Sequence, residues 1–168
     1  YADNGLDLNR DQTKLMAKES ILLRRAFNQF APDVAVDFHE YRPYRRDFVF
    51  FGENGIASAY DVMFLYSGNL NVPKKLRDLT QDVFVDAAKR EMTKRGLTHR
   101  DYISTLKIMG DIQFNQGSTN ARASATSFAL ANTVSSLIEV RGVGLGRESF
   151  KRRVMTTFWV AQSYLRTA

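Results

Sequence analysis

The stretch 33–41, Asp-Val-Ala-Val-Asp-Phe-His-Glu-Tyr, constrains the fold of this chain more than any other. Val34, Val36 and Phe38 alternate with smaller or polar residues, and a proline breaks the chain just before them, which predicts a buried strand of an α/β sheet. Ligands of open α/β sheets bind beyond the carboxyl ends of the strands. His39 stands at that end, so a rigid element could aim its imidazole at a metal ion or a substrate. The alternative, more common for a single histidine, is an ordinary structural role.

Composition limits the class of protein. A chain of 168 residues with 44% hydrophobic residues suits one domain with a real core. The net charge of +6 allows anionic partners without requiring them. The absence of cysteine excludes disulfides and Cys-ligated zinc. No apolar run reaches the roughly 18 residues that a membrane helix needs.

Hydrophobic periodicity predicts helices that alternate with strands, which indicates an α/β layered domain. The predicted helices are 13–30, 73–95, 123–132 and 148–165, and the predicted strands are 33–41, 61–66, 102–112 and 134–140, with a further strand or buried loop at 47–52. Gly96 is expected to stop the second helix. The residues expected on the inward sides of the second and last helices are Leu76, Leu79, Val83, Ala87, Phe150, Val154, Phe158, Ala161 and Leu165.

Two further polar features stand beside predicted elements. In Asp7-Leu-Asn-Arg-Asp11, the Arg10 guanidinium beside the Asn9 amide suits a planar carboxylate, because both groups present donors in fixed geometry. The alternative is that Asn9 or Asp11 caps a helix and Arg10 is a solvated surface charge. Glu139 stands in an otherwise apolar strand, where a carboxylate must be paired, metal-linked or protonated. Its alternative role is a structural ion pair with Arg141 or another arginine.

These features, in this order, resemble the carboxypeptidase A-like zinc metallocarboxypeptidases, through Asp7-Leu-Asn-Arg-Asp11, Asp37-Phe-His-Glu-Tyr41 and Ile138-Glu139. The resemblance implies an α/β fold with a mixed, mostly parallel twisted sheet and helices on both faces. It implies a zinc cofactor with His39 as one ligand and Glu139 as the general base. It also implies that Asn9 and Arg10 hold the carboxylate of a peptide substrate, which would make the protein an exopeptidase.

The sequence also departs from that family. The family's first two zinc ligands come from an upstream His-x-x-Glu motif, and these 168 residues contain none. The family's second substrate-binding arginine also belongs to that upstream part. The family's late-loop tyrosine is not found either; the loop before Glu139 offers Asn120 and Arg122 instead, and Arg122 is expected to contact an anionic substrate. The segment 141–147, Arg-Gly-Val-Gly-Leu-Gly-Arg, looks like the divergent bacterial branch of the family.

We therefore expect the C-terminal portion of a metallocarboxypeptidase domain, inactive and a poor zinc binder by itself. An upstream segment or a homo-oligomer is expected to cover the open edge of its sheet, and a membrane is not expected as a partner.

Three other functions remain open. An aspartoacylase or succinylglutamate desuccinylase-like deacylase would share the Asp-Leu-Asn-Arg motif, the histidine and the late glutamate, but would act on an acyl-amino acid. The stretch 41–46, Tyr-Arg-Pro-Tyr-Arg-Arg, interleaves aromatic residues with arginines as single-stranded nucleic-acid grooves do, although a rim loop of an active site is favoured and nucleic acid is not expected to be a partner. A non-catalytic scaffold fragment is the third.

Overall fold

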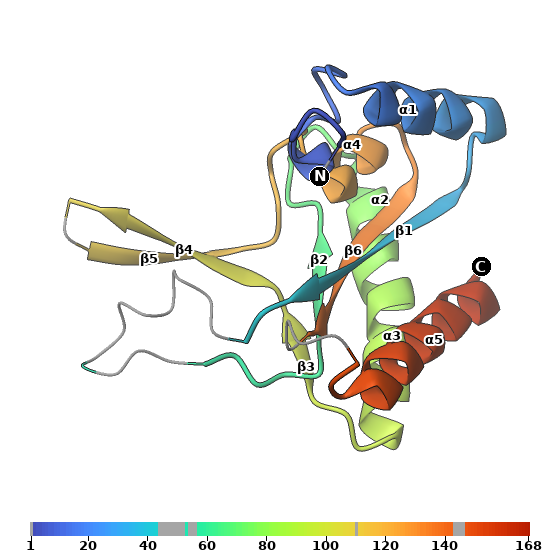
Figure 1. Ribbon diagram of the computed structural model, residues 1–168. Helices are drawn as coiled ribbons and strands as arrows, with labels where there is room; N and C mark the ends of the chain where they lie inside the picture. The colour runs from blue at the N-terminus through green and yellow to red at the C-terminus, as the bar shows by residue number, and fades with distance from the viewer. Residues whose placement is uncertain (1, 44–52, 54–56, 110, 143–146) are drawn as a thin grey trace.

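The computed structural model describes residues 2–43, 53, 57–109, 111–142 and 147–168. Helices lie on both sides of a central sheet, and a hairpin projects from this body (Figure 1). The helical elements are η1 (Leu8–Arg10), α1 (Lys18–Phe30), α2 (Lys74–Asp78), η3 (Leu79–Val85), α3 (Asp86–Lys94), α4 (Ser124–Ala129) and α5 (Phe150–Thr167). The strands are β1 (Val34–Tyr41), β2 (Val62–Tyr66), β3 (His99–Asp101), β4 (Ile103–Ile108), β5 (Asp111–Gln116) and β6 (Val134–Arg141).

The main sheet has four strands in the order β1-β6-β2-β3. β1 runs parallel to β6 and β2 runs parallel to β3, whereas β2 and β6 are antiparallel. The sheet is therefore mixed and mostly parallel, with helices on both faces, which confirms the predicted fold class. No helix within the described residues is long and apolar enough to cross a membrane.

The larger part of the core lies between one face of the sheet and η3, α3 and α5. Phe64 of β2 and Ile138 and Val140 of β6 are at most 1% exposed there. Because successive strand residues point to opposite faces, Leu137 and Glu139 lie on the other face of β6. The even-numbered residues of β6 thus face the larger part of the core, and the odd-numbered residues face a smaller group of helices on the other side of the sheet.

The helices on that other side of the sheet, the second layer, are α4 and α1. Leu65 and Leu137 of the sheet pack with Ala125 of α4. The rings of Phe27 in α1 and Phe128 in α4 stack with their centroids 4.5 Å apart, so α1 is fastened to α4. This layer lies on the same face of the sheet as Glu139.

The helix α5 contacts the rest of the molecule through a different face from the predicted one. Four of the five residues expected to face inward are 46% to 80% exposed: Phe150, Val154, Phe158 and Leu165. The buried side chains are instead Thr156, Val160, Ser163 and Tyr164. The Tyr164 hydroxyl donates to Ser136 Oγ of β6 at 2.9 Å, and Arg153 pairs with Glu40 of β1 at 2.6 Å. These contacts decide the rotation of the helix about its axis, which its apolar periodicity alone predicted wrongly.

The predicted helix 73–95 is present, but its middle segment, η3, is π-helical. Leu79 and Val83, expected to face inward, are 42% and 43% exposed, while Phe84 and Val85 are buried. A π-helical turn bonds residue i to i+5, so the apolar face departs from the period of 3.6 on which the prediction rested. The helix ends where expected, at Gly96, which takes a left-handed φ of +69°.

The stretch 102–112 is not one strand. It folds back on itself as the antiparallel pair β4 and β5, with Met109 at the bend in a left-handed φ of +50°. Such a φ is uncommon for a residue other than glycine, so the alternation of residues did not reveal the reversal. The strand β3, just before it, was not predicted either. The possible strand or loop at 47–52 lies outside the described residues.

The helix α1 begins at Lys18 rather than at residue 13. Leu15 takes a φ of +54°, which a right-handed helix cannot contain. The Asp11 carboxylate accepts hydrogen bonds from the backbone N–H groups of Met16 and Ala17, at 3.0 and 2.9 Å. Asp11 therefore orders the turn that leads into α1. Its carboxylate binds backbone N–H groups just before the helix, which is similar to the capping role considered from the sequence.

Candidate active site

The parallel pairing of β1 with β6 brings two of the predicted site residues together. Its register pairs His39 directly with Glu139, although one hundred residues separate them in the chain. Paired residues of adjacent strands point to the same face of a sheet. The carboxylate of Glu139 is also close enough to contribute to raising the pKa of the His39 imidazole.

A cleft of about 510 Å³ opens on this face and collects the other predicted residues. It lies between the sheet, the start of α4, the segment around η1 and the base of the β4–β5 hairpin. Its lining includes Asn9, Arg10, Arg122 and Glu139, together with Leu65, Tyr102, Ser104, Asn115, Gly117, Ser118, Thr119, Asn120, Ala123 and Leu137. Two arginines, the Asn9 amide and one carboxylate, from three separate parts of the chain, thus share one cavity.

Asn9 is fixed by one hydrogen bond of its backbone and one of its side chain. Its backbone N–H donates to Asp7 Oδ1 at 2.9 Å, which caps η1. Its side-chain Oδ1 accepts from the backbone N–H of Ser124 at 2.8 Å. Because the amide oxygen is used in this way, the Nδ2 group is the end of Asn9 that remains to donate to a ligand.

Arg10 and Arg122 are both exposed and bring positive charge to the cleft. Arg10 donates from Nη1 to the backbone oxygen of Asn9 at 2.9 Å, and the described residues offer it no carboxylate partner. The backbone N–H of Arg122 donates to Asn120 Oδ1 at 3.1 Å, so a side chain of the same loop orders its backbone. Both arginines therefore add positive charge to the lining of the cleft.

His39 is fixed by a neighbour on its own strand. Its Nε2 lies 3.0 Å from Asp37 Oδ2, and that same oxygen accepts from Ser124 Oγ at 2.6 Å. The hydrogen bond to Asp37 raises the pKa of the His39 imidazole, outweighing its burial. Burial would raise the pKa of the Asp37 carboxyl, but the hydrogen bonds from His39 and Ser124 outweigh it, so that pKa is lowered.

The sequence prediction missed Asp37 and Ser124. Asp37 precedes His39 by two residues, so the alternation of the strand already placed both on one face. That signal was available from the sequence. No local pattern connects Ser124, which is 87 residues away from Asp37.

The apolar floor of the cleft was missed as well. Leu65 and Leu137 are only 8% and 1% exposed and form a small apolar cluster with Tyr102 packed against it. Leu65 comes from β2, Leu137 from β6 and Tyr102 from the residue just before the hairpin. This floor lies beside the charged groups, which gives the cleft both a polar and an apolar part.

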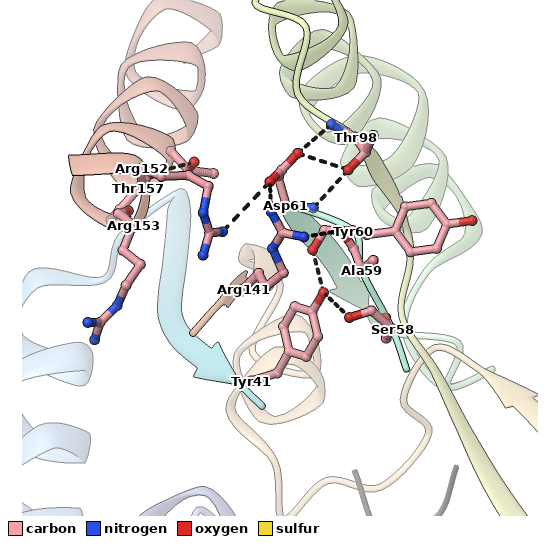
Figure 2. A network of polar contacts seen from close by, with 11 residues as sticks. Tyr41, Ser58, Ala59, Tyr60, Asp61, Thr98, Arg141, Arg152, Arg153 and Thr157 are labelled. Atoms are coloured by element: carbon pink, nitrogen blue, oxygen red, sulfur yellow. Dashed lines mark hydrogen bonds and ion pairs between the residues drawn. The ribbon is translucent and has the colours of Figure 1, made fainter. Parts of the chain in front are cut away.

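Arg141, one of the arginines named from the sequence as a structural ion-pair partner of Glu139, pairs with a different carboxylate. Arg141 instead binds Asp61 through Nη2 at 2.7 Å and the Ala59 carbonyl through Nη1 at 2.7 Å, as Figure 2 shows. Asp61 also accepts from the Thr98 backbone and hydroxyl, each at 2.9 Å. Arg141, two residues after Glu139 on the same strand, therefore belongs to a separate network of polar contacts.

Tyr41 belongs to the same network and does not form a stacking surface. Its side chain is only 5% exposed, and its hydroxyl donates to the backbone oxygens of Tyr60 and Ser58 (Figure 2). A base cannot stack on a ring that the protein already covers. The remaining part of the aromatic and basic stretch, 44–46, lies outside the described residues.

The described residues do not form a complete metal site. They contain no group of three or more His, Cys, Asp or Glu side chains that could hold a metal ion. A catalytic zinc ion needs about three protein ligands. The resemblance implies His39 as one such ligand, and that role stays a prediction.

Comparison with known proteins adds a relationship that covers the whole chain. It is 28% identical over 169 residues to a "Probable carboxypeptidase 2" of Trichophyton verrucosum (strain HKI 0517) and to one of Arthroderma benhamiae (strain ATCC MYA-4681 / CBS 112371), matching all of this chain and 32% of each relative. A "Carboxypeptidase 2" of Trichophyton rubrum is 27% identical over 174 residues. The chain is similar to fungal carboxypeptidases. It spans about a third of the length of these curated relatives.

The similarity to proteins named carboxypeptidase agrees with the enzyme class expected from the sequence, whereas the expected bacterial branch finds no support, since these relatives are fungal. No protein-family model matches the chain. No solved structure matches it significantly.

Proposed function

We propose that this chain is part of a zinc-dependent carboxypeptidase and supplies its substrate-carboxylate site, its general base and one metal ligand. The observation that carries the proposal is the shared cleft, which Asn9, Arg10 and Arg122 line together with Glu139, the residue paired with His39 of the neighbouring strand. The relatives named carboxypeptidase support the peptidase class.

The cationic side of the cleft recognises the C-terminal carboxylate of a peptide. A guanidinium group can donate two parallel hydrogen bonds to a carboxylate, and a fixed amide can add a third. Arg10 supplies the guanidinium and Asn9 the amide, whose orientation follows from its hydrogen bond to Ser124. Arg122 contributes a second positive charge on the rim. Binding of the terminal carboxylate would place the last peptide bond of the substrate over Glu139.

Glu139 acts as the general base. A carboxylate in a half-buried position can accept a proton from an attacking water molecule and pass it to the leaving amine. Glu139 lines the same cleft as Arg10 and Arg122 and pairs in register with His39 on the adjacent strand, which supports this role. The floor formed by Leu65 and Leu137 leaves apolar surface for the substrate's side chain.

His39 would hold zinc together with ligands that the described residues do not supply. The curated relatives are about three times as long as this chain, and a protein of their length would have other residues for this role. When bound by three protein ligands, zinc lowers the pKa of a coordinated water toward about 7 and polarises a carbonyl.

The test compares matched substrates of the full-length protein. A blocked dipeptide with a free C-terminal carboxylate should be hydrolysed, whereas the same dipeptide with an amidated C-terminus should not. The variant Arg10→Ala should lose most of this discrimination, and Lys14→Ala, an exposed cation outside the cleft lining, should keep it.

A preference for N-acyl-amino acids over peptides would overturn the proposal in favour of a deacylase. Equal hydrolysis of the free and the amidated peptide would refute the role of the arginine and amide pair. Absence of hydrolysis with either class of substrate would indicate a non-catalytic scaffold.

A further inference from the structure

The two arginines of the cleft belong to chain segments that hydrogen bonds tie together. The backbone N–H of Gln12 donates to the carbonyl oxygen of Arg122 at 3.2 Å. The backbone N–H of Ser124 donates to Asn9 Oδ1 at 2.8 Å. The two segments therefore lie side by side, and Figure 1 shows the start of the chain against α4. Arg10 and Arg122 thus line one cleft from neighbouring stretches of backbone.

The lining of the cleft carries more positive than negative charge. Among the lining residues that the structure describes, Arg10 and Arg122 are cationic, and Glu139 supplies the one carboxylate. Arginine stays protonated in proteins, so titration removes neither positive charge. Like charges in one cleft repel each other, and the described residues give neither guanidinium group a carboxylate partner. An anionic ligand would relieve this repulsion.

Recognition of a single C-terminal carboxylate leaves Arg122 without a task. Asn9 and Arg10 are consecutive residues, and one guanidinium fork with one amide supplies the donors that a carboxylate accepts. Arg122 belongs to a different segment. Its backbone is fixed twice, because its N–H donates to Asn120 Oδ1 at 3.1 Å and its carbonyl accepts from Gln12. Cationic groups from two separately fixed segments suit a ligand with two carboxylates.

We infer that the cleft selects peptides that end in glutamate or aspartate, with Arg10 and Asn9 on the main-chain carboxylate and Arg122 on the side-chain carboxylate. The inference rests on the proposed function and names its substrate class. Arg122 is thereby a specificity-determining residue.

The wall of the cleft at the hairpin agrees with an acidic side chain. Ser104 of β4 and Asn115 of β5 pair in register, and both line the cleft. Hydroxyl and amide groups can donate hydrogen bonds to a carboxylate. A substrate ending in lysine or arginine would instead add a third positive charge to a lining that already holds two.

The test measures the binding of three blocked dipeptides by calorimetry. The peptides have a free C-terminal carboxylate and differ only in the last residue, which is glutamate, glutamine or lysine. The full-length protein carries Glu139→Gln in every sample, so that hydrolysis does not interfere and all variants share one background. We expect the glutamate peptide to bind about fivefold more tightly than the glutamine peptide, as one well-formed exposed ion pair allows, and the lysine peptide to bind most weakly.

Substitution of Arg122 separates its role from that of Arg10. Arg122→Ala should weaken binding of the glutamate peptide about fivefold and leave the glutamine peptide nearly unchanged, which abolishes the preference. Arg122→Lys keeps the charge without the planar fork and should keep part of the preference. Lys14→Ala, which removes an exposed cation outside the cleft lining, should keep all of it.

Equal binding of the glutamate and glutamine peptides would overturn the inference. An equal loss for both peptides in Arg122→Ala would also overturn it, since Arg122 would then bind the terminal carboxylate. The proposed function fails by other results. Unchanged binding after amidation of the glutamine peptide would refute the site for the terminal carboxylate. Absence of hydrolysis of both free peptides by the wild-type protein would refute the peptidase, while the binding comparison still decides the preference for acidic residues. Absence of binding by all three peptides would overturn both.

Discussion

Single residues of this chain take their roles from the face of the strand on which they lie. Ile138 is fully buried against the helices, while its neighbour Glu139 reaches the cleft on the other face. The same alternation along β1 places Asp37 beside His39. Residues that are adjacent in sequence thus separate into core and site.

The clearest test of a single residue is Glu139→Gln in the full-length protein. The amide has nearly the same shape but cannot take up a proton at neutral pH. We expect kcat to fall about 10²- to 10⁴-fold, with a much smaller change in KM, because a general base acts in the transition state. Steady-state kinetics with a blocked dipeptide would measure both constants. The matched change Glu148→Gln, at an exposed position away from the cleft, should leave them unaltered. Unaltered turnover in Glu139→Gln would leave this residue a structural carboxylate.

The carboxyl of Asp11 predicts a pH dependence of stability. Hydrogen bonds from the backbone N–H groups of Ala17 and Met16 lower its pKa in the folded protein. Its contribution is therefore fully present above the unfolded-state pKa of about 3.9 and is lost as the pH falls through the lower folded-state value. Asp11→Asn should lower the free energy of unfolding at pH 7, and this difference should shrink in acid.

Urea unfolding of the wild-type and Asp11→Asn proteins between pH 7 and pH 3 checks this expectation. The exposed carboxyl of Asp33 serves as the control, since Asp33→Asn should have little effect at any pH in this range. A difference between wild type and Asp11→Asn that stays constant with pH would contradict it.

At the scale of elements, the helix α5 shows how packing overrides periodicity. Its apolar stripe of Phe150, Val154, Phe158 and Leu165 is exposed, while Val160 and Tyr164 contact the core. The periodicity correctly indicated a helix. The side of that helix that meets the sheet follows from its partners in β6 and α3.

Two valines on α5 allow a matched test of this orientation. Val160 is 0% exposed and Val154 is 46% exposed. Removing two buried methyl groups should cost Val160→Ala about 2 kcal/mol of unfolding free energy, from lost burial and the remaining cavity. Val154→Ala should be nearly neutral, since alanine has the better helix propensity and little burial is lost. Chemical denaturation measures both, and the reverse order of the two effects would show that the other face is buried.

At the scale of the whole molecule, the proposed zinc site and the cleft have different requirements. The cleft is complete enough within the described residues to bring Asn9, Arg10, Arg122 and Glu139 together. The metal site is not, because those residues contain no group of three candidate ligands. Recognition of a carboxylate and binding of a metal are therefore expected to differ in how they depend on the rest of the protein.

We expect the 168-residue chain by itself to bind zinc weakly and to show no carboxypeptidase turnover. One histidine ligand cannot hold zinc in the geometry that tight binding needs. Calorimetric titration with zinc measures the affinity, and the full-length protein provides the comparison. Tight one-to-one binding by the chain alone, with turnover, would show that it contains a ligand set other than the one proposed.

The exposed stripe on α5 and the edge position of β1 in the described sheet predict self-association of the isolated chain. Apolar patches and unpaired strand edges favour contact with another copy. Light scattering should show species larger than a monomer, and Phe158→Glu should shift them toward the monomer. Leu70→Glu, at a residue 83% exposed in a loop, serves as the control. A monomeric wild-type chain would contradict the prediction.

Local patterns in the sequence determined the strands around His39 and Glu139, the start of α4 and the end of the second helix at Gly96. These features depend on interactions between residues close in the chain, such as alternation in strands and the left-handed conformation that glycine accepts. The Asn9-Arg10 pair and the two strand-end residues could be selected in the same way, because their residue types and order are visible without coordinates.

Only the tertiary structure decided which of these residues meet. The pairing of His39 with Glu139, the hydrogen bond from Ser124 to Asp37 and the commitment of Arg141 to Asp61 all join residues that are 80 or more positions apart. The exposed face of α5 and the reversal at Met109 were likewise decided by packing and strand pairing. Periodicity along a chain carries the spacing of apolar residues but not the identity of their partners, because a partner is chosen by burial and hydrogen bonding across the whole fold.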